Sequence, residues 1–480
     1  MLHENKCKWC SIVVAAALGI IATQLPIADS NKLLPQMMDY KEWTVLEITL
    51  ENTEQKNLDI LQLENQDIRP MGSPSTPYVS RIAVSPKKLK EVKKELNDHR
   101  LSFKILTTDL SRELLPTVAA SREELAHGSS TYDRYMTFKE MENHIDALST
   151  HLPNKVKHKV KGKTLEGHDI HLVTVSDYTI DEDKSVIFVE GGIHAREWIS
   201  PAAAMNLIDH LVESPALTKH IEWHIMPVVN PDGYVYSKSW DRLWRKNRSG
   251  TWFFFCTGVD LNRNFGFHWA GDGASTNPCK QNYAGESQFS EKESKAVRDA
   301  VLEVKDRIEA YVTFHSYGQY IMYPWGHTVK TQHENHESLD KVGQAMAKAI
   351  LTAEGKRYKV GPAGKVLYVA SGASDDWVAN VTGAPYIYTI ELRDDGSYGF
   401  ILPETKIQAG VNDAWVAMQV IAKEVMDQSN LRTTIPEDDP ADLPAEPKKR
   451  RRRGCKGKIH NGKKRKRCRR TKNKDYVINH

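Results

Sequence analysis

A histidine and a glutamate stand three positions apart where a predicted strand gives way to a predicted helix. His194 and Glu197 lie within residues 191–198, a segment that begins with two glycines. At this spacing an imidazole and a carboxylate can turn toward one point. Two such ligands and a distant histidine would form a three-ligand zinc site with one position open for water. Taken alone, the pair is more typical of a salt bridge at a helix start.

Three other clusters favour the metal site. His315 ends a predicted strand and can supply the third ligand. Glu391 also ends an apolar strand, where a solvated carboxylate would be out of place. Residues 244–248 and 260–264 place guanidinium groups in aromatic, glycine-rich loops. The four clusters together raise the metal interpretation above the salt bridge.

Strands and helices in alternation must position these groups. Strands are expected at 185–190, 222–229, 310–315 and 385–392. A turn is expected at 230–233, and a helix capped by Ser200-Pro201 runs to Leu211. The alternation predicts an α/β sheet with helices on both faces and functional groups at the carboxyl ends of strands.

Residues 31–122 read as a separate small α/β unit. Strands are expected at 43–50 and 102–106, and Ser85-Pro86 opens a helix that runs to about His99. This region carries no clustered catalytic side chains. It ends in a polar stretch, residues 111–130, that suits proteolytic nicking.

Length and composition are those of an ordinary globular protein, and the N-terminal sequence predicts that it is exported. The chain has 480 residues, 40% hydrophobic and 27% charged, which excludes collagen, a coiled coil and wholesale disorder. At about 100–200 residues per domain, two to four domains are expected. Two lysines precede an apolar run at 11–22, which is typical of a secretory signal peptide and too short for a membrane span. A short buried helix is the alternative.

The C-terminal residues differ sharply in charge from the rest. Residues 448–480 hold 17 Lys and Arg and one acid, a net charge of +16. Because the whole chain carries +4, the remainder carries −12. This tail either binds heparan sulfate or another polyanion, with Cys455 and Cys468 closing a basic loop, or is a solvated appendage. A nucleic-acid partner is not expected, because the signal peptide argues against it.

Taken together, the ordered motifs place the chain beside a known family. From about Thr131 to Val425 it closely resembles the secreted zinc metallocarboxypeptidases of the pancreatic A/B type, on the order His-x-x-Glu, Arg-x-x-Arg, Asn-Arg, His-Ser-Tyr, Tyr and Glu-Leu-Arg-Asp. The resemblance implies a mixed eight-stranded sheet flanked by helices. It divides the chain into a signal peptide (1–30), a small α+β inhibitory propeptide (31–122), a catalytic domain (123–428) and a tail (429–480).

The resemblance also implies a role for each motif. One zinc ion per chain would be bound by His194, Glu197 and His315, and would activate water. Glu391 matches the general base, and Arg248 matches the residue that stabilises the oxyanion. Asn262 and Arg263 match the pair that grips the terminal carboxylate, and Tyr368 matches a mobile tyrosine that closes over the substrate. The family's subsidiary substrate contacts correspond to Arg196, Arg245, Ser316 and Tyr317. Its disulfide corresponds to Cys256 and Cys279.

Substrate preference depends on one position in that family. Asp375 lies 16 residues before Glu391, at the floor of the family's side-chain pocket, where Asp marks the B-type and an apolar residue the A-type. A buried carboxylate there selects peptides that end in Lys or Arg. The alternatives are that Asp375 is a surface helix cap with Asp376 facing inward, that the enzyme is of the A-type, or that a non-catalytic scaffold binds polyanions.

Two processing steps are expected. A trypsin-like protease would release the propeptide near Arg122 or Arg112, and a cut after Arg453 would expose a basic end that the enzyme itself could trim toward Pro447. Two sequons begin at Asn247 and Asn380. The first lies inside the active-site cluster and is expected to stay unmodified.

Overall fold

The computed structural model describes residues 38–49, 67–72, 79–112, 114, 132–180, 183–250 and 256–434. The expected signal peptide, Arg122 and the basic tail lie outside the described residues. The chain divides into two units, Met1–Arg432 and Thr433–His480, and the features below belong to the first. None of its described helices is both long enough and apolar enough to cross a membrane.

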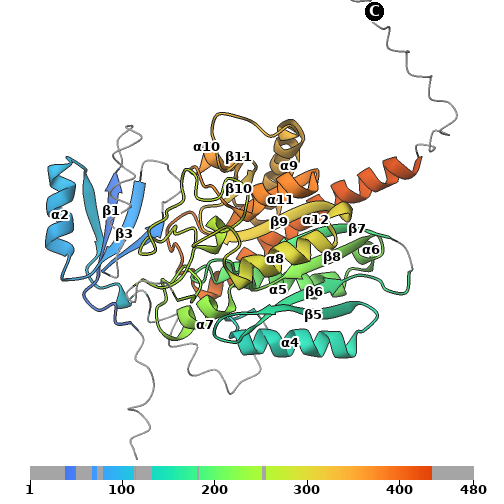
Figure 1. Cartoon of the computed structure of the whole chain (residues 1–480), viewed down its shortest axis with the longest axis horizontal. Coiled ribbons are helices and arrows are strands. Elements are labelled where there is room, and N and C mark those ends of the chain that lie inside the picture. The colour runs from blue at the N-terminus through green and yellow to red at the C-terminus, as the bar shows by residue number, and fades with distance from the viewer. Residues whose placement is uncertain are drawn as a thin grey trace, which may run out of the picture. The chain divides into compact units, whose positions relative to one another are not determined.

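An eight-stranded mixed sheet forms the centre of residues 132–434, as predicted (Figure 1). Its strand order is β11-β10-β12-β9-β7-β8-β6-β5. Neighbours among β8, β7, β9 and β12 are parallel, whereas β5, β6 and β8 pair antiparallel, as do β10 and β12. The strands are β5 (Val156–Lys163), β6 (Asp169–Val175), β7 (Ser185–Glu190), β8 (Ile221–Met226), β9 (Ile308–Ser316), β10 (Tyr320–Tyr323), β11 (Lys359–Pro362) and β12 (Tyr386–Leu392).

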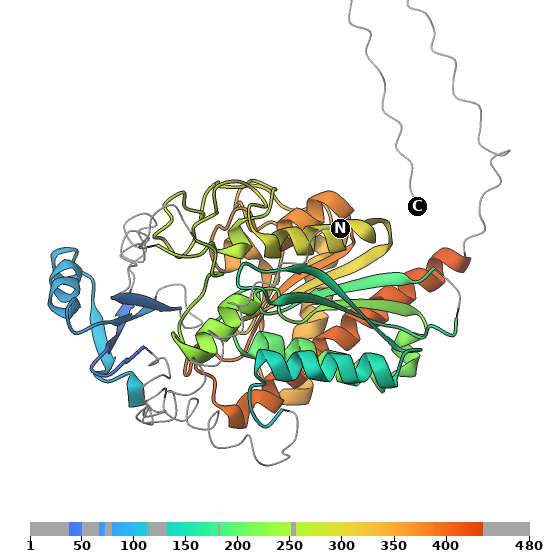
Figure 2. The same ribbon diagram turned by 60° about the horizontal axis from the view of Figure 1, so that its bottom comes forward.

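Helices cover both faces of this sheet, because successive strand residues point to opposite sides. In β7, Ile187 and Val189 join a core with α4 (Phe138–His151), α5 (Ile199–Val212), α9 (His336–Glu354) and α12 (Ile407–Thr434). Val186 and Phe188 join the opposite core, with α8 (Lys292–Glu303) and α11 (Ser374–Thr382). Figure 2 shows α8 on one side of the strands and α4 on the other.

Two local predictions in the sheet domain were wrong. Residues 230–233 do not form an isolated turn, because Asn230 caps α7 (Pro231–Ser239) by accepting a 2.9 Å hydrogen bond from Gly233 N. Pro231 therefore takes the first helical position, which suits its fixed φ. Ser200 lies inside α5 rather than capping it, and its hydroxyl donates to Phe314 O on β9 at 2.5 Å.

A second, four-stranded sheet with order β2-β3-β1-β4 lies nearer the N-terminus. The strands are β1 (Thr44–Thr49), β2 (Ile68–Gly72), β3 (Val79–Val84) and β4 (Phe103–Thr107). Leu46, Ile48 and Ile82 pack against Val92 and Leu96 of α2 (Leu89–Asp98). This helix begins three residues later than predicted, because Lys88 N and Leu89 N both bond Ser85 O in a preceding turn.

Candidate active site

Three side chains converge at the carboxyl ends of β7 and β9. His194 Nδ1 lies 2.9 Å from Glu197 Oε1, and His315 Nδ1 lies 3.1 Å from both His194 Nδ1 and Glu197 Oε2. All three residues are buried and form a group that could hold a metal ion. Burial disfavours the Glu197 carboxylate, but the two histidines outweigh it and hold the pKa of Glu197 well below its usual value.

The turn after β7 needs its glycines to bring His194 to this point. Gly192 has a φ of +64°, and a Cβ there would lie 3.0 Å from Pro201 and 3.2 Å from the Val228 backbone. Only glycine takes this conformation without strain in so little space. The two glycines that begin the motif therefore shape the approach of the first ligand.

The donor set fits a zinc ion. Two imidazole nitrogens and a carboxylate are the ligands of many catalytic zinc sites, and ligands at about 2.0–2.2 Å from a tetrahedral ion lie roughly 3.3–3.5 Å apart. The separations of 2.9 and 3.1 Å found here are close to that value.

Asp260 supports the cluster from behind and received no role from the sequence. Its Oδ1 lies 3.1 Å from His194 Nε2, the nitrogen that faces away from the other ligands, and its Oδ2 accepts from Arg245 at 2.9 Å. A carboxylate behind a ligating histidine fixes the ring and its tautomer. The sequence did offer one indication of a role for Asp260, because it lies two residues before Asn262 within residues 260–264.

Glu391 stands beside His315, its register partner on the adjacent strand. The residue is partly buried, and its Oε2 has neither solvent nor a hydrogen-bond partner among the described residues. Burial, followed by the nearby Glu197 carboxylate, raises the pKa of Glu391 to about 8, whereas His315 and Arg245 oppose the rise. A carboxylate with this pKa can accept and return a proton near neutral pH.

The predicted cationic residues separate into two groups. Arg245 belongs to the ligand cluster, because it pairs with Asp260 and lies 3.8 Å from Glu197. Arg248 instead stacks on Tyr236, 3.6 Å from the ring centre, and lies 3.6 Å from Glu166. None of its recorded contacts within the described chain reaches the three ligands.

The other predicted substrate contacts surround the cluster. Ser316 N donates to Glu197 Oε2 at 3.1 Å, and Tyr317 OH donates to Met71 O of β2. Arg263 is buried beneath the exposed Tyr368, 5.9 Å from its ring centre. The Arg196 guanidinium packs over the Phe400 ring at 4.1 Å.

Asp375 is not a surface cap. The side chain is buried in the first turn of α11 and accepts a 2.7 Å hydrogen bond from Thr389 Oγ1 of β12. Burial and the adjacent Asp376 raise the pKa of Asp375 to about 6. Asp376 is also buried, but its oxygens are taken by Gly326 N and by the backbone and ring of His327.

Small residues border these carboxylates. A Cβ at Gly326 would lie 3.5 Å from Ala363 and 3.7 Å from Asp376 Oδ2. Side chains larger than alanine at these two positions would fill the space beside the aspartates.

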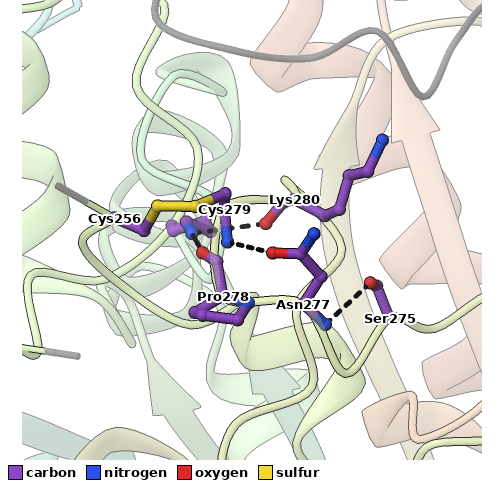
Figure 3. The surroundings of a disulfide bond; sticks show 7 residues. Cys256, Ser275, Asn277, Pro278, Cys279 and Lys280 are labelled. Atoms are coloured by element: carbon purple, nitrogen blue, oxygen red, sulfur yellow. Dashed lines mark hydrogen bonds between the residues drawn. A yellow bond between two sulfur atoms is a disulfide. The ribbon is translucent and has the colours of Figure 1, made fainter. Parts of the chain in front are cut away.

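A disulfide joins Cys256 and Cys279, as the resemblance implies (Figure 3). Their Cα atoms are 4.8 Å apart, and Cys279 N donates to Asn277 Oδ1 at 2.9 Å. The first sequon residue, Asn247, is fully buried, and its amide donates to Glu291. A glycan has no room there, whereas Asn380 is exposed.

Comparisons with known proteins agree with this geometry. A family model described as zinc carboxypeptidase matches residues 141–417. Carboxypeptidase B of Astacus astacus is 40% identical over 298 residues, 61% of this chain and 97% of that protein. Human carboxypeptidase B is 36% identical over 343 residues, 70% of this chain and 81% of that protein.

Solved structures agree as well. The crystal structure of thrombin activatable fibrinolysis inhibitor matches with a TM-score of 0.72 and 32% identity, over 81% of this chain and 100% of that one. Carboxypeptidase A from Helicoverpa armigera matches with a TM-score of 0.75 and 28% identity, over 82% of this chain and 100% of that one.

Proposed function

The chain belongs to the zinc carboxypeptidase family and is a metallocarboxypeptidase; from this premise we propose that it releases Lys and Arg from peptide C-termini and is secreted as a zymogen. The observation that carries the basic preference is the buried Asp375 beside the strand of Glu391. Gly326 and Ala363, which lie beside Asp376, add no bulky side chain to this part of the site. A buried carboxylate facing such a substrate selects a cation through desolvated charge pairing.

In the proposed mechanism each residue of the site has one task. His194, Glu197 and His315 would hold the zinc ion, which would supply Lewis-acid polarisation of the scissile carbonyl and a lower pKa for water. Glu391 accepts a proton from the attacking water at a carboxylate oxygen and passes it to the leaving amine.

Cations and amides hold the substrate in this scheme. Asn262 and Arg263 grip the terminal carboxylate, which an internal peptide bond does not offer, so cleavage is confined to chain ends. Arg248 stabilises the negative charge on the carbonyl oxygen. Because Arg248 stacks on Tyr236 and neighbours Glu166 in the present structure, it would have to turn toward the substrate.

One assay tests the proposed activity. The protein, freed of its N-terminal region by trypsin, is given hippuryl-arginine and hippuryl-phenylalanine with and without a chelator. We expect chelator-sensitive hydrolysis with arginine strongly preferred. Preference for phenylalanine would identify an A-type enzyme, and no hydrolysis of either by zinc-loaded protein would favour the non-catalytic polyanion-binding alternative.

The inhibitory role of the N-terminal unit is supported by its contacts with the sheet domain. Arg69 NH2 lies 2.9 Å from Asp241 Oδ2 with both side chains buried, and Tyr40 OH donates to the same carboxylate. Met71 O accepts from Tyr317, an expected substrate contact. We infer that residues 38–114 restrict access to the site until a trypsin-like protease cuts, either at the exposed Arg112 or at Arg122.

Weakening this interface tests the zymogen. Arg69→Met leaves Asp241 without its buried ion pair, which is strongly unfavourable, so the uncut protein should hydrolyse hippuryl-arginine several-fold faster than wild type. After trypsin treatment the two should be equal. Lys104→Met is the matched control, because its exposed ion pair with Glu47 stays within the small sheet. Equal activity of all three proteins before cleavage would contradict inhibition through this contact.

The basic tail is proposed to bind heparan sulfate or another polyanion after secretion. Such binding should weaken steeply as the salt concentration rises, because the release of counterions from the polyanion is then less favourable. Heparin affinity chromatography of the chain with and without residues 448–480 measures it. Mass spectrometry of the secreted protein tests self-trimming, which a tail intact to His480 or ending stably at Arg453 would contradict.

A further inference from the structure

A row of polar side chains crosses the sheet two residues before the zinc-ligand row, which we define as His315 with Glu391. Glu190 on β7 is the register partner of Thr313 on β9, which in turn pairs with Thr389 on β12. Because directly paired residues point to the same face, these three side chains leave the sheet together. We call them the pocket row.

The first turn of α11 rests on the pocket row through two hydrogen bonds. Ser374 Oγ donates to Glu190 Oε1 at 2.7 Å, and Thr389 Oγ1 donates to Asp375 Oδ2 at 2.7 Å. All four residues are buried. The orientation of Asp375 therefore depends on its own bond and on the bond of the residue just before it.

Ser374 also connects this row to the expected carboxylate grip. Its backbone N donates to Asn262 Oδ1 at 2.9 Å. Ser374 thus links Glu190 to two proposed substrate contacts. Asp375, the next residue, would face the substrate's side chain, and Asn262 would bind its terminal carboxylate.

Glu190 is an unfavourable residue for a protein interior. Its side chain is 0% exposed, and burial raises the pKa of Glu190, although the hydroxyls of Ser374, Tyr311 and Thr313 oppose the rise. Burying a carboxyl group costs free energy. An apolar residue would pack there at lower cost but could not accept the hydrogen bond from Ser374.

We propose that Glu190 is a positioning residue for substrate selectivity, which acts through Ser374 to hold Asp375 and Asn262 in their binding orientations. The inference rests on the proposed preference for Lys and Arg. Charge pairing in a buried pocket depends steeply on distance and angle. Displacement of Asp375 therefore penalises arginine substrates, whereas displacement of Asn262 raises KM for every substrate.

Three variants of the trypsin-processed protein test this role. Glu190→Met removes the acceptor at similar length, Ser374→Ala removes the donor, and Glu190→Gln is the matched control that keeps an oxygen able to accept the bond. The measurements are kcat and KM for hippuryl-arginine and hippuryl-phenylalanine, together with zinc content. The ratio of the two kcat/KM values is taken on one preparation, so the folded fraction cancels.

Loss of one buried hydrogen bond predicts a fall of about tenfold in this arginine-to-phenylalanine ratio for Glu190→Met and for Ser374→Ala. The double variant should fall no further than either single, because both changes remove the same contact. Glu190→Gln should stay within about twofold of wild type. Zinc content should be unchanged in all of them.

The contrary outcomes separate the two levels of the proposal. A wild-type enzyme without preference for arginine refutes the basic specificity itself. A wild-type preference that survives in Ser374→Ala, or an equal loss for both substrates with an unchanged ratio, refutes only the role of Glu190. A ratio lost in Glu190→Gln as fully as in Glu190→Met also overturns it, because charge rather than the hydrogen bond would then matter.

Discussion

The zinc-ligand row and the pocket row lie two residues apart on β9 and β12, yet the chain uses them differently. In the first, a strand residue itself contacts another proposed ligand, because His315 Nδ1 lies 3.1 Å from Glu197 Oε2. In the second, strand residues act through the first turn of α11, which carries Asp375. The difference suggests that reaction chemistry and substrate preference can be altered separately, although one sheet face supports both.

Replacing the proposed base, Glu391, should abolish turnover without changing zinc content or substrate preference. Glu391→Gln keeps the shape of the side chain but cannot accept a proton, so kcat should fall by about a thousandfold for both hippuryl substrates. Zinc content and the arginine-to-phenylalanine ratio should hold. Glu303→Gln, at an exposed position on α8, is the control and should retain full activity. Substantial turnover by Glu391→Gln would exclude it as the base.

Removing the charge of Asp375 should abolish the preference for arginine without slowing the hydrolysis of hippuryl-phenylalanine. Asp375→Ser removes the carboxylate that faces a basic side chain, so kcat/KM for hippuryl-arginine should fall by about a hundredfold while that for hippuryl-phenylalanine changes little. Asp376→Asn is the comparison, because Asp376 bonds Gly326 and His327 and should affect thermal stability more than preference. Equal losses for the two substrates in Asp375→Ser would mean that the pocket does not read charge.

The sequence predicted the proposed metal ligands better than the residues of the pocket row. The strand at 185–190 is found at the same bounds, and His194 and Glu197 were identifiable because a short spacing brings them together within one turn. Asp260 and Glu190 received no role, because their partners come from distant segments and are set by strand register. Glu190 did leave one signal, as the charged last residue of an otherwise apolar strand.

Helix starts were harder to predict than strands for a related reason. Asn230-Pro231 reads equally as a turn or as a capped helix, and the Asn230 side chain is fixed here by donating to Ile193 O, 37 residues earlier in the chain. Tertiary contacts of this kind decide between local structures of similar energy.

Acidification should reduce the preference for arginine by neutralising Asp375. With the pKa of Asp375 raised to about 6 by burial and Asp376, the carboxyl is charged above that pH and neutral below it. The arginine-to-phenylalanine ratio should therefore fall about tenfold between about pH 7.5 and about pH 5, following the ionised fraction. Using the ratio removes the pH dependence of the shared chemistry. A profile as steep in Asp375→Ser as in wild type would assign the change to another group.

The smallest expected effect gives the sharpest comparison within the pocket row. The hydrogen bond from Thr389 lowers the pKa of Asp375 against the effect of burial, so Thr389→Val should raise that pKa and move the midpoint of the ratio to higher pH. At about pH 7.5 the ratio should fall by about threefold, because part of the carboxyl is then neutral and the remainder is less well oriented. Thr313→Val is the matched control, since Thr313 lies next in the same row but faces Glu190 rather than Asp375. Equal midpoints in both variants would show that the pKa of Asp375 does not depend on Thr389. Substrate preference would then be set by α11 alone and not by the sheet residues beneath it.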